Sequence, residues 1–304
     1  MPSLQPALVF KDEATQLNSL YWTSRYSYRR TAGMLKLISE TGSHSPDPRV
    51  NQLWGASEIG ESSVATRKLS DFIKILDNDS AELRSISILK ICSAFENALC
   101  GYFYLCCLYD PQKELPTYPG KRIPDILKHP AEFEKRKIEI KLRCDNSLHG
   151  KYTKRLNHIC DTWGLARILG PHVVRLNSYY EKRHLIAHDQ SLAGTDSPEH
   201  SSTEIINTRI TINEASWKCM ISDFSLILDD LDEQVSKKIV RDGGLSLAIY
   251  RIIDRDGPQM LSDIQKKLSN EWRMGNLKAA KTRSLATTIG RVVKQLDGNK
   301  YKIS

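Results

Sequence analysis

Long stretches without glycine or proline are the feature that most constrains the fold of this chain. Residues 61–100 and 199–242 contain neither, and the 304 residues include only 16 Gly and 12 Pro. A fold of many short strands needs frequent turns, where these two residues concentrate. We therefore predict a mainly α protein. Hydrophobic residues make up 40% and charged residues 26% of the chain, a composition that excludes wholesale disorder and fibrous repeats.

The most apolar segment, residues 86–109, is predicted to be a buried core helix rather than a membrane span. Lys90, Glu96 and Asn97 lie in its first half. Its uninterrupted apolar part, residues 98–109, is shorter than the roughly 18 residues that a spanning helix needs. The first eleven residues lack the pattern of a secretory signal. We expect a cytoplasmic protein with no membrane partner.

Seven cysteines without a Cys-x-x-Cys pair are typical of reduced thiols in a core. One combination of side chains could in principle bind zinc, but its spacing matches no standard pattern, and we expect neither a metal nor another cofactor. That combination is Cys144, His149, His158 and Cys160.

Charge and turn residues divide the chain into three predicted domains. These are an N-terminal helical extension (1–62), a helical bundle (63–240) and a C-terminal domain (241–304) that begins at a Gly-Gly hinge. The C-terminal domain holds 13 Lys/Arg and 6 Asp/Glu of a chain whose net charge is +8, so it is suited to polyanions. A second basic segment, residues 111–158, is explained equally well by lysines that maintain solubility.

Periodicity predicts the helices of the first two domains, and clusters of turn residues predict the breaks between them. The predicted helices cover residues 11–40, 63–76, 80–108, 153–168, 173–188 and 213–240, with a basic helical stretch ending near residue 144. Asp77–Asp79 is expected to interrupt the second and third helices, residues 191–203 to form a loop, and residues 208–212 to form a short strand.

The C-terminal domain has the pattern of three short helices followed by a strand. Its apolar stripes lie in residues 245–252, 261–268 and 285–296, and the third helix is predicted over residues 282–296. This pattern resembles a winged helix-turn-helix, in which the third helix enters a major groove and the wing lies on the backbone. The resemblance implies nucleic-acid contacts, although winged helices also serve as protein or dimer modules. The implied contact residues are Arg283, Thr287, Arg291 and Lys294 on the third helix, and Lys300 and Lys302 on the wing.

The strongest chemical motif lies in residues 179–189, where Arg183 and His188 are separated by four residues. A histidine can take the proton of a ribose 2′-OH, and an arginine can stabilise the charge that develops on the phosphate. Such cleavage yields a 2′,3′-cyclic phosphate and requires RNA. Positions five apart on a straight helix point about 140° apart, so these side chains converge only at a bend, a helix end or a subunit interface.

Two alternatives compete for the same residues. His184 and His188 are one helical turn apart, as in the zinc motif HExxH, but Leu185 replaces the glutamate that would act as base. Alternatively, Arg183 is structural and His188 caps a helix C-terminus, where positive charge suits the helix dipole.

The segment Arg183-His184-Leu185-Ile186-Ala187-His188 resembles the R-x4-6-H motif of the HEPN superfamily, and the architecture of residues 63–240 agrees with it. The resemblance implies a homodimer with two motifs facing one cleft, acting as a metal-independent endoribonuclease in anti-phage defence or a toxin–antitoxin system. It also implies a protein partner that restrains the nuclease. By position, His188 would be the general base or acid, Arg183 the phosphate stabiliser and His184 the polar residue after the arginine. Glu96 is a weaker candidate for a supporting hydrogen bond.

The sequence thus favours a HEPN-type ribonuclease whose basic winged helix recruits RNA or DNA. The alternatives are a non-catalytic HEPN scaffold or sensor, and a transcription regulator that binds DNA through the winged helix while its helical part only dimerises or binds a small ligand.

Overall fold

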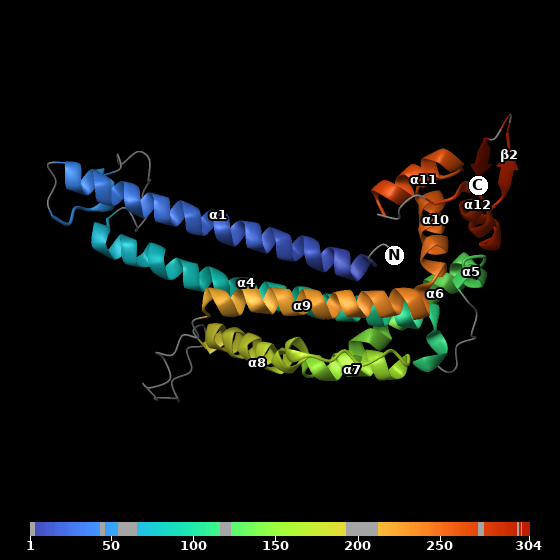
Figure 1. Cartoon of the computed structure of the whole chain (residues 1–304), viewed down its shortest axis with the longest axis horizontal. Helices are drawn as coiled ribbons and strands as arrows, with labels where there is room; N and C mark the ends of the chain where they lie inside the picture. Colours follow the sequence, from blue (N-terminus) through green and yellow to red (C-terminus); the bar gives the residue numbers. More distant parts are fainter. Residues whose placement is uncertain are drawn as a thin grey trace. The chain divides into compact units, whose positions relative to one another are not determined.

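The computed structural model describes residues 4–42, 46–53, 66–115, 123–192, 212–272, 277–296, 298 and 300–304. Within these ranges the protein is mainly α, as predicted (Figure 1). The elements before the C-terminal segment are α1 (Gln5–Thr41), α2 (Val50–Leu53), α4 (Leu69–Tyr109), η1 (Pro111–Lys113), α5 (Ile123–Ile126), α6 (Pro130–Ser147), α7 (Tyr152–Thr162), α8 (Pro171–Leu192), α9 (Glu214–Val235) and η2 (Ser236–Val240). The C-terminal elements are α10 (Gly243–Asp256), β1 (Gln259–Met260), α11 (Leu261–Asn270), α12 (Ala279–Thr288), β2 (Val293–Gln295) and β3 (Tyr301–Ile303).

The chain forms two compact units, each assembled from separate stretches of sequence. The first contains residues 1–10, 95–177 and 223–304, and the second contains residues 11–94 and 178–222. The division into three domains at residues 62 and 240 stays a prediction.

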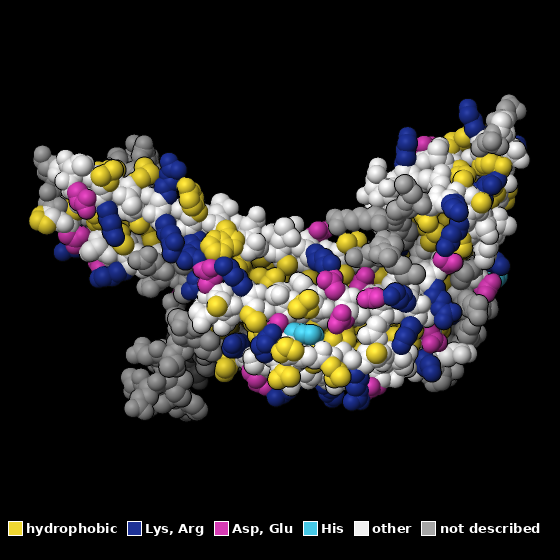
Figure 2. All heavy atoms as spheres, viewed as in Figure 1, with side chains coloured by type: hydrophobic (Ala, Val, Ile, Leu, Met, Phe, Trp, Pro, Cys, Tyr) yellow, Lys and Arg dark blue, Asp and Glu magenta, His cyan; other side chains and the backbone are white. Residues whose placement is uncertain are grey.

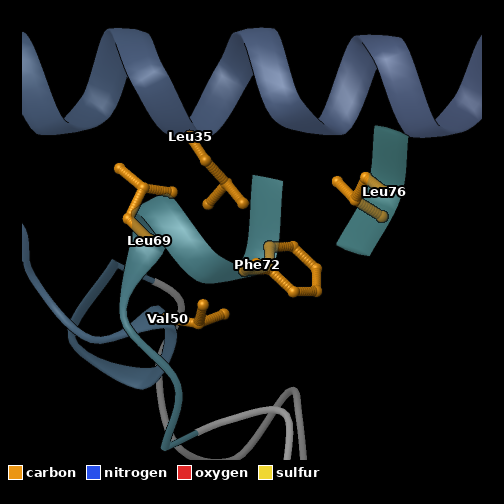
Figure 3. Close-up of a cluster of buried hydrophobic side chains, with 5 residues drawn as sticks. All are labelled: Leu35, Val50, Leu69, Phe72 and Leu76. Carbon is orange, nitrogen blue, oxygen red and sulfur yellow. The ribbon is translucent and has the colours of Figure 1, made fainter. Parts of the chain in front are cut away.

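In the second unit, the start of α4 packs against α1 and α2 through a cluster of aliphatic and aromatic side chains (Figure 3). Leu35 of α1 and Val50 of α2 are fully buried, and Phe72 lies between them and the next turn of α4. Because these apolar side chains leave water together, they fix the beginning of a 41-residue helix. The other members of the cluster are Leu69 and Leu76.

Asp47 caps the first turn of α4 from outside the helix. Its carboxylate accepts hydrogen bonds from the backbone N–H of Ser70 and from the Ser70 hydroxyl, both at 2.9 Å. These bonds hold the pKa of Asp47 below its usual range, because they favour the charged form.

Replacing Asp47 with Ala is expected to speed amide exchange in the first turn of α4 at neutral pH. Since the pKa of Asp47 is lower in the folded state, its contribution is full above the unfolded value of 3.8 and is lost as the pH falls through the folded pKa. Hydrogen exchange of residues 66–72, compared between parent and variant at each pH, measures this. A difference in exchange that stays the same well below pH 4 would contradict it.

The first unit is built around four aromatic rings from different elements. Phe95 of α4 stacks on Phe224 of α9, with ring centroids 4.1 Å apart and planes within 7°. Phe10 of α1 and Tyr152 of α7 meet the same pair edge-on. Because all four rings are almost completely buried, this cluster joins four helices.

Asp232 fastens the beginning of α1 to this unit. Its Oδ1 accepts hydrogen bonds from the backbone N–H of Leu4 at 2.9 Å and from the hydroxyl of Tyr102 at 2.7 Å. Burial, together with the neighbouring Asp232 carboxylate, raises the pKa of Tyr102 well above its usual range. Tyr102 therefore stays protonated at neutral pH and donates its hydrogen to Asp232.

The C-terminal segment, drawn in orange and red in Figure 1, belongs to the first unit. Its strands form a three-stranded antiparallel sheet in the order β1-β3-β2, and Lys294 of β2 lies opposite Lys302 of β3. The predicted apolar stripes of α10 and α11 are buried, including Ile249, Ile252 and Ile264. In the third predicted stripe Ile289 is buried, whereas Val292 and Leu296 are exposed because α12 ends at Thr288. Tyr250 of α10 packs edge-on against Phe133 of α6, which attaches the segment to the helices before it.

Several predicted helix boundaries are wrong, including the start of the first helix, which is Gln5 rather than residue 11. α4 continues through Asp77–Asp79 without a break, because a few residues of low helix propensity cost less than the packing of the helix on either side gains. α7 ends at Thr162 rather than at residue 168, and α12 ends at Thr288 rather than at residue 296. α8 also extends to Leu192, so residues 191 and 192 are helical instead of beginning the loop.

Several other predicted features fall wholly or partly outside the described residues. These are the helix start at residue 63, the loop after residue 192, and residues 208–211 of the predicted strand. Ile212, the last residue of that prediction, lies in irregular structure immediately before α9.

Candidate functional site

α8 carries the arginine and histidines of the motif on one continuous helix. It begins at Pro171, directly after Gly170, whose φ of 139° turns the chain. Proline suits a first helical position because its missing N–H would have no partner within the helix. The helix continues to Leu192, so Arg183, His184 and the backbone of His188 lie within regular helical structure. The side chain of His188 lies outside the description.

The helix period explains the burial of each motif residue on α8. Tyr179 and Ile186 are buried, and Arg183 lies between them on the same row and is half-buried. His184 occupies the next row and is exposed. Its imidazole stacks on the ring of Tyr180 one turn earlier, with centroids 6.3 Å apart and planes within 9°. Tyr180 therefore restrains His184, a role the sequence analysis missed although the i, i+4 spacing indicates it.

On α8, positions 183 and 188 point in different directions, as the sequence predicts for a straight helix. α8 is α-helical throughout, so position 188 lies about 140° around the axis from position 183. A single helix of this kind does not point both side chains at one phosphate. The arrangement needs either a second helix or a second subunit.

Glu96 lies within the first unit, whereas the α8 motif belongs to the second. Its carboxylate accepts a hydrogen bond from the hydroxyl of Tyr152 at 3.0 Å and lies 3.7 Å from the guanidinium of Arg155. Since Tyr152 also belongs to the aromatic core, these contacts connect α4 with the start of α7. A catalytic role for Glu96 stays a prediction.

The four residues predicted to form one basic face of the third C-terminal helix lie on different elements, because α12 ends at Thr288. Arg283 and Thr287 lie on the helix, whereas Arg291 follows it and Lys294 lies on β2. The guanidinium of Arg283 lies 4.0 Å above the ring of Tyr301 of β3, and that of Arg291 lies 4.9 Å from the ring of Tyr250. These cation–π contacts tie the basic groups to the sheet and to α10.

The hairpin of β2 and β3 gathers three exposed lysines. Lys294 and Lys302 are direct cross-strand partners, and Lys300 lies just before β3. Like charges placed opposite one another weaken a hairpin unless an anion lies between them. Lys294 is predicted to lie on a helix, but it lies on β2.

Among the described residues, no group of three His, Cys, Asp or Glu side chains is placed to hold a metal ion. One helix of the described chain, Glu82–Tyr109, is long and apolar enough to cross a bilayer, but 61% of its most apolar window is buried inside the protein. Its buried side chains include Phe95, Tyr102 and Phe103, as expected of a core helix.

Comparison with known proteins gives no family assignment. No protein-family model matches the chain, and neither a curated protein nor a solved structure was found to match it.

Proposed function

We propose that the chain is a metal-independent endoribonuclease of the HEPN type, acting as a homodimer in the cytoplasm, with a C-terminal winged helix that binds nucleic acid. The observation that carries the proposal is the placement of Arg183 and His184 on unbroken α8, half-buried and exposed respectively, with position 188 one turn beyond His184. A half-buried arginine is held in place by its surroundings while its guanidinium can still reach a phosphate.

The reaction that suits these groups is attack by the ribose 2′-OH on the adjacent phosphorus. His188 accepts the proton of the 2′-OH as the oxygen forms its bond to phosphorus, and Arg183 stabilises the charge on the phosphoryl oxygens. The bond from phosphorus to the 5′-oxygen then breaks, and that oxygen leaves with a proton drawn from water. The products are a 2′,3′-cyclic phosphate and a 5′-hydroxyl, and no oxidant or metal is consumed.

A homodimer resolves the 140° separation between the two positions. If two copies of α8 face each other, Arg183 of one subunit and His188 of the other can approach the same phosphate. The proposed setting is a prokaryotic anti-phage or toxin–antitoxin system, in which a partner protein restrains the nuclease.

The proposal is tested by incubating the purified protein with total cellular RNA in EDTA and analysing the ends of the fragments. The parent is expected to produce 2′,3′-cyclic phosphate ends, whereas Arg183→Ala and His188→Ala produce none. His149→Ala, which removes an exposed histidine elsewhere, serves as the matched control and should cleave like the parent. Intact RNA in every sample would favour the scaffold or regulator instead.

The winged-helix part of the proposal is supported by the order of the C-terminal elements, α10-β1-α11-α12-β2-β3, with the β2–β3 hairpin in the place of the wing. In this arrangement the exposed lysines of the hairpin would lie on the phosphate backbone.

Removing the hairpin lysines is expected to weaken duplex DNA binding and to flatten its salt dependence. Each lost phosphate contact should reduce the slope of log K against log salt by about 0.9, so Lys294→Ala with Lys302→Ala should reduce it by about 1.8. Fluorescence anisotropy at several salt concentrations measures this. The matched control is Lys237→Ala, since Lys237 is exposed but already paired with Glu233. An unchanged slope would remove the hairpin from the interface.

A further inference from the structure

The exposed face of α1 in the second unit combines basic and aromatic side chains in a way that the proposed reaction does not use. Residues 14–39 contain four basic residues and no acidic residue, and within α1 this segment lies between Glu13 and Glu40. The basic residues are Arg25, Arg29, Arg30 and Lys36. Figure 2 shows Lys/Arg and hydrophobic side chains side by side over this helix.

The helix period places the exposed members of this segment on one face. Tyr26, Arg29, Arg30 and Leu37 follow the spacing i, i+3, i+4 and i+11, with Gly33 between them. Tyr26 is 68% exposed and Leu37 60%, and both arginines are exposed. The opposite side of α1 is buried and includes Leu35 of the cluster in Figure 3. We call Tyr26, Arg29, Arg30 and Leu37 the α1 face.

A neighbouring aromatic side chain shows which ring is open to a ligand. The indole of Trp22 has the guanidinium of Arg25 5.3 Å from its centroid and the ammonium of Lys218 4.7 Å from it, and its N–H donates to Asn18. Glu214 in turn pairs with both Arg25 and Lys218. Trp22 is thus engaged within the protein, whereas Tyr26 presents its ring to solvent.

The basic groups of the α1 face are likewise available. In the part of the chain that the structure describes, neither Arg29 nor Arg30 forms an ion pair, and no ring contact engages Tyr26. An open ring beside two arginines, with an apolar side chain two turns further on, is the combination that binds single-stranded nucleic acid. Bases stack on the ring and phosphates meet the arginines. A duplex offers the same phosphates, but its bases are already stacked inside.

We propose that the α1 face binds single-stranded RNA, as a substrate-binding surface in the unit that also carries the α8 motif. This inference rests on the proposed ribonuclease function for its choice of RNA. Binding through charge and stacking does not itself need the 2′-OH, so it can be measured apart from cleavage.

The experiment uses a fluorescent 2′-O-methyl oligouridylate, which cannot undergo attack by the 2′-OH, and the full chain carrying Lys294→Ala and Lys302→Ala to silence the hairpin. Tyr26→Ala is expected to weaken binding by about 5- to 150-fold, the range for loss of one stacked base. Tyr26→Phe should restore binding, because it keeps the ring. Arg29→Ala with Arg30→Ala should reduce the salt slope by about 1.4, since single strands contribute about 0.7 per phosphate.

Controls separate the alternatives. Lys74→Ala removes an exposed basic residue of the same unit that is paired with Asp71, and it should bind like the unaltered face. Heparin lacks bases and anionic vesicles lack both bases and a chain, so the parent should bind the oligouridylate at least tenfold more tightly than either. Equal binding of heparin, insensitivity to Tyr26→Ala, or tighter binding to vesicles would overturn the inference. If the oligouridylate binds as expected while natural RNA remains uncleaved, the α1 face stands and the ribonuclease proposal fails.

Discussion

Replacing His188 with Ala is expected to slow RNA cleavage by about 100- to 10,000-fold, the usual contribution of a positioned general base. Arg183→Ala should cost about 100- to 1,000-fold, because it removes charge stabilisation that acts on the transition state. Single-turnover cleavage of a short labelled RNA in EDTA gives both rates. Circular dichroism and size-exclusion chromatography establish that each variant remains folded and keeps its oligomeric state.

A mixed dimer tests whether the motif works across subunits. Arg183→Ala chains retain His188 and His188→Ala chains retain Arg183, so a heterodimer of the two carries one complete pair divided between its subunits. If the site forms across the interface, differently tagged chains purified as a heterodimer should regain cleavage that neither homodimer shows. A heterodimer as inactive as the two homodimers would mean that Arg183 and His188 do not combine across subunits.

Phe95→Ala is expected to destabilise the first unit by about 3–5 kcal/mol, the usual cost of emptying a buried phenylalanine site. The side chain is fully buried, and its loss removes the stack on Phe224 together with the edge contacts to Phe10 and Tyr152. These rings come from α1, α7 and α9, so they cannot all move inward to fill the space.

Urea denaturation followed by tryptophan fluorescence measures this effect. Ser93→Ala, two residues earlier on α4, is the matched control. Its hydroxyl is exposed and donates a hydrogen bond to the carbonyl of Leu89. The free energy of unfolding of this variant should therefore differ from that of the parent by less than about 0.5 kcal/mol. A Phe95→Ala variant as stable as this control would show that the aromatic cluster does not hold the first unit together.

Apolar periodicity predicts where most helices form, because a helix is stabilised chiefly by burial of its apolar face. The apolar run of residues 86–109 is most stable when it is buried in a core, and this part of α4 is largely buried. The apolar stripes of α10 and α11 are buried for the same reason. Polar residues alone predict helix breaks less well than apolar residues predict helices. Asp77–Asp79 is a run that favours turns, yet packing on both sides carries the helix through it.

The two helices predicted too long end at the same kind of glycine. Gly164 and Gly290 have φ of 62° and 80°, a left-handed conformation that other residues rarely adopt. After each, a backbone N–H returns to the last turn, from Leu165 to Cys160 and from Arg291 to Ala286. Both glycines are visible in the sequence, and treating them as helix C-caps would have placed Arg291 and Lys294 beyond the helix.

The motif residues themselves could be found from the sequence because Arg and His at this spacing have a chemical rationale. Their surroundings could not. The stacking of Tyr180 on His184 and of Arg283 on Tyr301 depends on side-chain positions, and the second contact joins residues on different elements. The open face of α1 emerges only when the buried side of the helix and the engagement of Trp22 are known.

The hydrogen bond from Leu4 to Asp232 also has a consequence for the order of events during biosynthesis. The two residues are 228 positions apart, so the beginning of α1 leaves the ribosome long before its acceptor has been translated. Until then Ala7 and Phe10, which are buried in the finished protein, have no core to enter. An apolar segment that must wait for distant partners is open to aggregation and to chaperones. The nascent chain therefore exposes this apolar segment until Asp232 and its neighbours have been made.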